Sequence, residues 1–151
     1  MAAHEQSGVT ALREMILACE SYHHTMAGLL RIGVPEANVL THLAVAGPLT
    51  AREVADRIGL TPSAVTTVLD RLEAAGLALR RPHPTDRRRT LIAVTPSGQD
   101  ALDTSTQWLS ATLDAAGASH RASLVKTLTA LAAGLREQLS LARHGSVNGS
   151  R

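Results

Sequence analysis

Residues 50–76 constrain the fold of this chain more than any other segment, because they read as two capped helices separated by a tight turn. Thr50 is followed three residues later by Glu53, which is the spacing of a capping box at the start of a helix. A second helix opens with Thr61 as N-cap and Pro62 as its first residue. Two short helices at this spacing are typical of a helix-turn-helix, although an ordinary packed helix pair has the same signature.

The second helix, predicted over residues 61–75, combines an apolar stripe with a polar outer face suited to DNA. Its small first residues allow close approach to DNA, and the free backbone N–H groups of a helix start attract phosphate. Short hydroxyl side chains can reach base edges, and Arg71 lies where it can reach a phosphate. The candidate DNA-contacting residues of this helix are Thr61, Pro62, Ser63, Ala64, Thr66, Thr67 and Arg71.

The hydrophobic pattern then changes to that of a β-hairpin. Residues 77–81 roughly alternate, residues 82–90 are rich in proline and charge, and residues 90–95 are β-branched and apolar. Five arginines and one aspartate between residues 78 and 89 give a local charge of +4. Such a tip, or wing, fits the negative potential of a narrow minor groove, and a solvated loop is the alternative. Its candidate DNA-contacting residues are Asp86, Arg87, Arg88 and Arg89.

Long helices are predicted on both sides of this unit. The chain of 151 residues has one Trp, one Tyr and no Phe, so its core must be aliphatic. The last helix carries a leucine edge that needs a partner, either a second chain or a fold-back within a monomer. The expected fold class is mainly α with a small β wing (α+β). The expected division is a dimerisation helix (1–34), a winged helix-turn-helix (35–96), dimerisation helices (97–143) and a disordered tail (144–151).

The segments TPSAVTTVLDRLEAAGLALRR and DRRRTLIAVTPSG, with the capping box before them, resemble the multiple-antibiotic-resistance regulator (MarR) family over roughly residues 35–100. The resemblance implies a winged helix with a dimerisation region built from both chain ends. It implies a homodimer on pseudo-palindromic, double-stranded operator DNA, usually as a repressor. Arg88 would enter the minor groove, and Asp86 would orient it through a charge-assisted hydrogen bond. Val94 departs from the leucine usual in the family, and Gly98 matches its glycine.

Many members of that family lose DNA affinity when a small aromatic acid binds between the dimerisation helices and the winged helix. A small-molecule effector is therefore a candidate partner. The aromatic or polar residues that could contact it are Tyr22, His23, His42 and Trp108, and ordinary packing is the favoured interpretation of each.

Cys19 allows a second type of regulation, through oxidation. The neighbouring Glu20 disfavours a thiolate, and Tyr22 is the single tyrosine available to activate it. The favoured interpretation of Cys19 is therefore a small buried hydrophobe. A redox-responsive regulator of the same family remains an alternative function.

Other function classes have weaker support. The sequence contains no phosphate-binding loop and no nucleophile–base set, so neither an enzyme nor a cofactor is expected, and its seven histidines are too scattered to indicate a metal site. No secretory signal or membrane span is visible, so a cytoplasmic protein is expected. A winged helix that binds other proteins is the remaining alternative, although such a module has no need of the arginine-rich wing.

Overall fold

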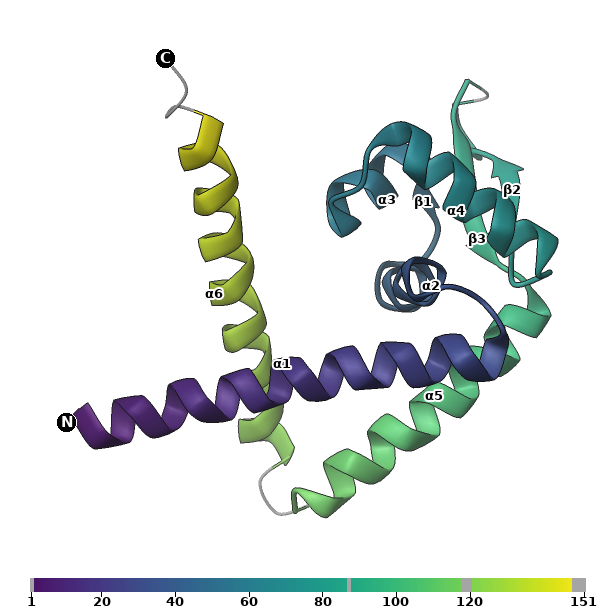
Figure 1. The fold of residues 1–151 in the computed structure, drawn as a ribbon. Coiled ribbons are helices and arrows are strands. Elements are labelled where there is room, and N and C mark those ends of the chain that lie inside the picture. Colours follow the sequence, from purple (N-terminus) through teal and green to yellow (C-terminus); the bar gives the residue numbers. More distant parts are fainter. Residues whose placement is uncertain (1, 87, 118–120, 148–151) are drawn as a thin grey trace. The chain divides into compact units, whose positions relative to one another are not determined.

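The structure, a computed structural model, describes residues 2–86, 88–117 and 121–147 (Figure 1). It is mostly helical with one small antiparallel sheet, which confirms the predicted fold class. In chain order the elements are α1 (Ala2–Leu30), α2 (Val34–Ala46), β1 (Leu49–Thr50), α3 (Ala51–Ile58), α4 (Pro62–Ala74), β2 (Ala78–Pro82), β3 (Thr90–Val94), α5 (Pro96–Ala115) and α6 (Arg121–Val147).

The sheet has three strands in the order β1-β3-β2, with every pair antiparallel. Ile92 of β3 lies in the middle, opposite Leu49 of β1 on one side and Arg80 of β2 on the other. β2 and β3 form the hairpin that the sequence predicted. The two-residue strand β1 was not predicted, because two residues are too few to show an alternating pattern.

The core of the winged helix lies where α2, α3, α4 and the sheet meet, and Figure 1 shows α2 end-on with α3, α4 and the sheet on one side of it. Leu69 and Leu72, on the predicted stripe of α4, are at most 1% exposed, as are Val39 of α2 and Val54 of α3. The packed side chains are aliphatic, as the composition required. The stripe of α4 is thus committed to the core, which fixes the opposite face of that helix toward solvent.

The chain divides into two compact units, Met1–Thr106 and Gln107–Arg151. The first holds α1 and the whole winged helix, and the second holds the last part of α5 and α6. α6 continues to Val147, so residues 144–147 of the segment predicted as a disordered tail are helical. Residues 148–151 lie outside the described part of the chain.

α1 ends at Leu30, and the next residue, Arg31, takes a left-handed conformation with φ 54°. Only its C-terminal part, around Met26 and Ala27, is buried against α2. Cys19 precedes that part and is exposed. The expectation that Cys19 is a small buried hydrophobe was therefore wrong for this chain, because the packed stretch of α1 begins after it.

In the second unit, leucines along α6 are exposed. Leu131, Leu135 and Leu139 are 45%, 39% and 50% exposed at intervals of four residues, so they share one edge of the helix. A row of exposed apolar side chains on a helix surface usually marks a site of interaction with another protein, a membrane or a ligand. Within the ranges that the structure describes, no helix is long and apolar enough to cross a membrane.

Candidate nucleic-acid interface

The predicted capping box fixes the start of α3. The Thr50 hydroxyl accepts a hydrogen bond from the Glu53 backbone N–H at 3.3 Å, and the Glu53 carboxylate accepts one from the Thr50 backbone N–H at 2.7 Å. The hydrogen bonds from Thr50 also lower the pKa of Glu53. The helix ends at Gly59, whose left-handed φ of 69° a residue with a side chain rarely adopts. The turn into α4 is therefore tight, as a helix-turn-helix requires.

The start of α4 is also capped as predicted. The Thr61 hydroxyl accepts a hydrogen bond from the Ala64 backbone N–H at 3.3 Å, and Pro62 occupies the first turn. Ser63 and Pro62 are exposed and Ala64 is half-buried. A helix start that is open to solvent carries a partial positive charge, so it can bind the phosphate of a nucleic acid.

Two exposed threonines follow on the outer face of α4. The hydroxyl of Thr66 donates to the carbonyl of Pro62 at 3.0 Å, and that of Thr67 donates to the carbonyl of Ser63 at 3.3 Å. Because each hydroxyl hydrogen is used within the helix, each oxygen remains available as an exposed acceptor. Amino groups of adenine and cytosine are the matching donors in a major groove.

The wing closes through a turn organised by Asp86. The backbone N–H of Arg89 donates to the Asp86 carbonyl at 2.9 Å, and the backbone N–H of Arg88 donates to the Asp86 carboxylate at 3.1 Å. The charge-assisted hydrogen bond that the resemblance implied between Asp86 and Arg88 is thus made to the backbone N–H of Arg88. Arg88 and Arg89 are exposed, and Arg87 lies outside the described residues.

His83 stabilises the same turn, a role that sequence reasoning missed. Its Nδ1 accepts hydrogen bonds from the backbone N–H groups of Thr85 at 3.3 Å and Asp86 at 3.2 Å. The backbone N–H of His83 donates to the Arg89 carbonyl at 3.0 Å. The order Pro-His-Pro in the sequence gave no sign of this, because the contact depends on the final path of the wing.

Arg80 belongs to the arginine cluster in sequence, but in the structure it forms ion pairs within the protein. Its guanidinium pairs with Asp70 at 2.8 Å and also with Glu73, both on α4. The hydrogen bond to Asp70 raises the pKa of Arg80. The local charge counted from the sequence thus overstates what the wing offers an anion, since this arginine is neutralised internally and ties β2 to α4.

Arg71 was predicted to reach a phosphate, and the structure gives it a protein partner. One of its guanidinium nitrogens lies 3.5 Å from a carboxylate oxygen of Glu36 in the first turn of α2. The Arg71 side chain is 69% exposed, whereas that of Glu36 is 1% exposed. The C-terminal half of α4 is therefore held by ion pairs, and its N-terminal half is open.

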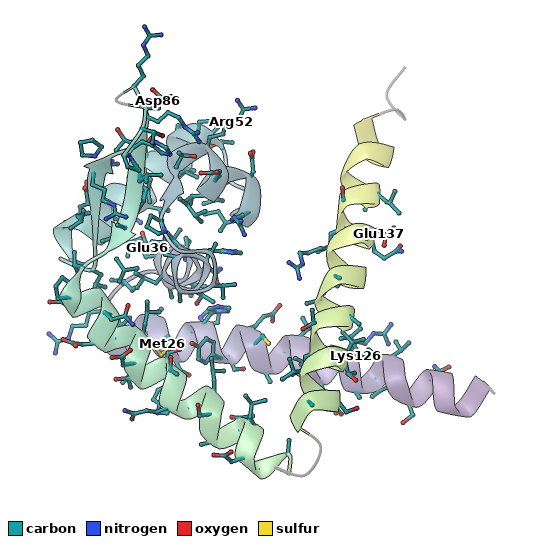
Figure 2. All side chains as sticks on the ribbon, turned by 180° about the vertical axis from the view of Figure 1, so that it is seen from behind. Met26, Glu36, Arg52, Asp86, Lys126 and Glu137 are labelled. Carbon is teal, nitrogen blue, oxygen red and sulfur yellow. The ribbon has the colours of Figure 1, made fainter. Side chains whose placement is uncertain are left out.

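Arg52 of α3 is a candidate that sequence reasoning missed. It is exposed, and Figure 2 shows it at the same end of the winged helix as Asp86 of the wing. Arg89 is close enough to α3 to lower the pKa of Glu53, a smaller effect than that of the Thr50 hydrogen bonds. Exposed arginines of the wing and of α3 thus lie at one end of the winged helix.

Comparisons with known proteins agree with this arrangement. A family model described as the MarR family matches residues 28–89. The uncharacterized HTH-type transcriptional regulator YcgE of Bacillus subtilis is 35% identical over 91 residues, which cover 58% of this chain and 57% of that protein. The crystal structure of RV1404 from Mycobacterium tuberculosis is 30% identical and covers 84% of this chain and 90% of that one, with a TM-score of 0.63.

This chain belongs to the MarR family. A Staphylococcus aureus MepR–DNA complex shares its fold, with a TM-score of 0.56 at 22% identity, covering 81% of this chain and 98% of MepR. The chain spans between about half and two thirds of the length of the curated relatives it matches. The resemblance noted in the sequence is thereby confirmed, and with it the winged helix-turn-helix.

Of the residues predicted to contact an effector in this MarR-family chain, Tyr22 and His23 have ring centroids 5.1 Å apart, and His23 is near enough to His42 to affect its pKa. The Tyr22 hydroxyl is hydrogen-bonded to Ser105 of α5. His23 is half-buried, with Nε2 3.5 Å from the Thr41 hydroxyl, and burial lowers its pKa. Trp108 is 40% exposed in the second unit and so belongs to a different body of the structure.

His42 is the fourth of these residues and lies near a cation of the helix-turn-helix. Burial lowers its pKa, and the charges of Arg57 on α3 and of His23 on α1 lower it further. No carboxylate contributes to that shift. This side of α2 therefore favours a neutral imidazole, and it would tolerate an added anion better than an added cation.

The first unit contains a small hollow and a larger one. The one beside Tyr22, between α1, α2 and α5, holds about 10 Å³, the size of one water molecule. A larger one of about 430 Å³ lies between the end of α2, the sheet and α5, and Pro48, Arg81 and Gln99 are among its lining residues. Sequence reasoning missed it because its walls come from segments far apart in the chain. Across the described ranges, no group of three or more His, Cys, Asp or Glu is placed to hold a metal ion.

Proposed function

We propose that this MarR-family protein is a dimeric transcriptional regulator that represses by binding double-stranded operator DNA. In this proposal the first turns of α4 enter a major groove, where Ser63, Thr66 and Thr67 face base edges. Thr61, Pro62 and Ala64 bring the helix start against a phosphate. The wing arginines Arg87, Arg88 and Arg89 reach an adjacent minor groove, and Asp86 holds their turn.

The observation that carries the proposal is the division of α4 into two halves. Its C-terminal half is tied to β2 and to α2 by Arg80 and by Glu36. Its N-terminal half is capped, exposed and lined with hydroxyl acceptors. A helix held rigidly at one end and open at the other suits insertion into a groove, because a reading surface must keep its geometry. A module that binds proteins through this face would have no need of an arginine wing beside it.

The dimer rests on the apolar edges of the terminal helices. α6 exposes Leu131, Leu135 and Leu139 along one edge, and α1 exposes Ile16 and Leu17. A two-fold dimer would cover such edges and would place two copies of α4 on a pseudo-palindromic site. The roles of residues 1–34 and 97–143 in dimerisation are part of this proposal.

The last part of the proposed function is a response to a small-molecule ligand. Arg57, near the half-buried His42, offers positive potential to a small organic anion. A ligand there would contact α1, α2 and α3 together, and it would act by changing how α3 and α4 are held. Because Cys19 is exposed, regulation by oxidation is also open to test. The test is whether peroxide releases the protein from DNA in the gel shift described below.

The decisive experiment is a gel-shift titration on the DNA upstream of the protein's own gene, repeated at several salt concentrations. Specific binding should weaken steeply with salt, because arginines displace counterions from phosphates. Arg88→Ala should weaken operator binding by at least about tenfold and leave the fold intact. Arg151→Ala is the matched control and should bind like the wild type, because Arg151 belongs to neither the proposed DNA-binding region nor the proposed dimerisation regions. Binding that depends on neither salt nor sequence would reject the proposal.

A further inference from the structure

The buried carboxylate of Glu36 is the least satisfied charged group in the winged helix. Its side chain is 1% exposed, and Figure 2 shows it inside the unit, beside α2. Neither of its oxygens accepts a hydrogen bond from any residue that the structure describes. An ionised carboxylate in such a place is costly unless an opposite charge compensates it.

The sequence makes room for this carboxylate at the start of α2. Gly33 is the N-cap residue, and a Cβ at that position would overlap the Glu36 carboxylate. The side chain of Glu36 is thus folded back over the first turn of its own helix. The partial positive charge of a helix start supplies part of the compensation there.

Arg71 of α4 supplies the remaining charge, at 3.5 Å from a Glu36 oxygen. The two partners are unequal. Arg71 is 69% exposed and would be well solvated without Glu36, whereas Glu36 would be buried without a counter-ion if Arg71 left. The carboxylate therefore holds the arginine, and through it the helix, in one place.

We propose that Glu36 is a positioning residue for DNA reading, and that Arg71 braces α4 against α2 instead of contacting a phosphate. This rests on the proposed function, since it concerns the helix proposed to enter the groove. Ser63 lies eight residues before Arg71, or about 12 Å along the helix axis. A tilt of about 5° at Arg71 would move Ser63 by about 1 Å, enough to spoil a contact with a base edge.

Arg80 completes the brace from the other side. It pairs with Asp70 and Glu73, the neighbours of Arg71 on α4, and it comes from β2. Successive residues on a helix point about 100° apart, so Asp70 and Arg71 anchor α4 in two directions. The C-terminal half of α4 is therefore held by both the sheet and α2.

The test is a double-mutant cycle on operator affinity, measured at several salt concentrations alongside the melting temperature. Arg71→Met should lower the melting temperature and weaken operator binding about tenfold, with no change in the slope of log Kd against log salt. Adding Glu36→Gln should restore most of the lost melting temperature, because the buried charge is gone, and should weaken operator binding no further, because the brace is already broken. Arg88→Met is the matched control, and its slope should fall by about 0.9.

Two results would overturn the inference. One is a slope that falls by about 0.9 for Arg71→Met, with losses that add to those of Glu36→Gln, since Arg71 would then contact a phosphate. If Arg71→Met does not fold, the double variant should still fold, and an equally unfolded double variant is the second such result. A wild-type protein that binds no operator would instead reject the proposed function, while the cycle on melting temperature would still test the pair.

Discussion

The two units of this chain use leucine in opposite ways. In the winged helix, Leu69 and Leu72 of α4 are at most 1% exposed, packed against α2, α3 and the sheet. In the second unit, Leu131, Leu135 and Leu139 of α6 are 39–50% exposed. The first region can therefore gain its stability from its own chain, whereas the second must bury its leucines against something else.

The largest difference between the regions should appear when one leucine in each is truncated. Leu72→Ala should lower the free energy of unfolding by about 2–5 kcal/mol, because the side chain is fully buried and leaves a cavity. Leu131→Ala removes the same atoms from an exposed position and should cost under about 0.5 kcal/mol in the monomer. Denaturant unfolding of both variants at several protein concentrations measures this. A loss for Leu131→Ala that grows with protein concentration would locate Leu131 in an interface between chains.

The second prediction concerns association directly. Leu135→Asp should raise the dimer dissociation constant at least about tenfold, because it places a charge on the apolar edge of α6. Ala133→Asp adds the same charge to the opposite, exposed face of the same helix, so it serves as the control. Analytical ultracentrifugation compares the two with the wild type. Equal dissociation constants for both variants would mean that the leucine edge of α6 does not mediate dimerisation.

Replacing one glycine by alanine in each unit should change stability in opposite directions. Gly98, in the first turn of α5, lies against the Leu77 carbonyl, and a Cβ there would overlap backbone. Gly98→Ala should therefore destabilise the winged helix by about 1–3 kcal/mol. Gly134 of α6 has no atom within 4 Å of an added Cβ, so Gly134→Ala should stabilise its helix by roughly 0.5–1 kcal/mol. Thermal unfolding decides both, and a loss at Gly134 would instead indicate close packing of α6 against a partner.

The same contrast explains what could be predicted from the sequence. The helix-turn-helix was predictable because Thr50, Glu53 and Thr61 act through local hydrogen bonds within a few residues. The charge arrangement was not, because the partners of Arg71 and Arg80 come from segments 35 and 7–10 residues away and meet only in the folded chain.

Strand β1 and the exposure of Cys19 also could not be predicted, because both depend on the final packing of the chain. β1 exists only as a neighbour of β3, so its two residues carry no pattern of their own. Cys19 sits on a helix with apolar residues throughout, and the sequence alone could not show that only its last turns are covered. Among the residues predicted to contact DNA, the places of Thr61 and Pro62 were predictable because a helix cap fixes them, whereas the ion pair of Arg71 required the fold.

The smallest expected effect is a pH dependence confined to the first region. Burial lowers the pKa of His42 below 6.5, and the positive charge of Arg57 acts in the same direction. The unfolded chain therefore binds this proton more readily than the folded one. The stability that neutral His42 contributes is complete above pH 6.5 and is lost as the pH falls through 6.5 toward the lower folded-state value.

The measurement is the melting temperature of the wild type and of His42→Gln between pH 7.5 and 5.5. The wild type should melt at a lower temperature as the pH falls, and His42→Gln should show a shallower decrease, because a neutral side chain then occupies the position at every pH. His23 also has a pKa lowered by burial, so His23→Gln combined with His42→Gln should flatten the dependence further. Parallel curves for the wild type and the double variant would contradict this, and the acid sensitivity would then have to come from outside the contact of α1, α2 and α3.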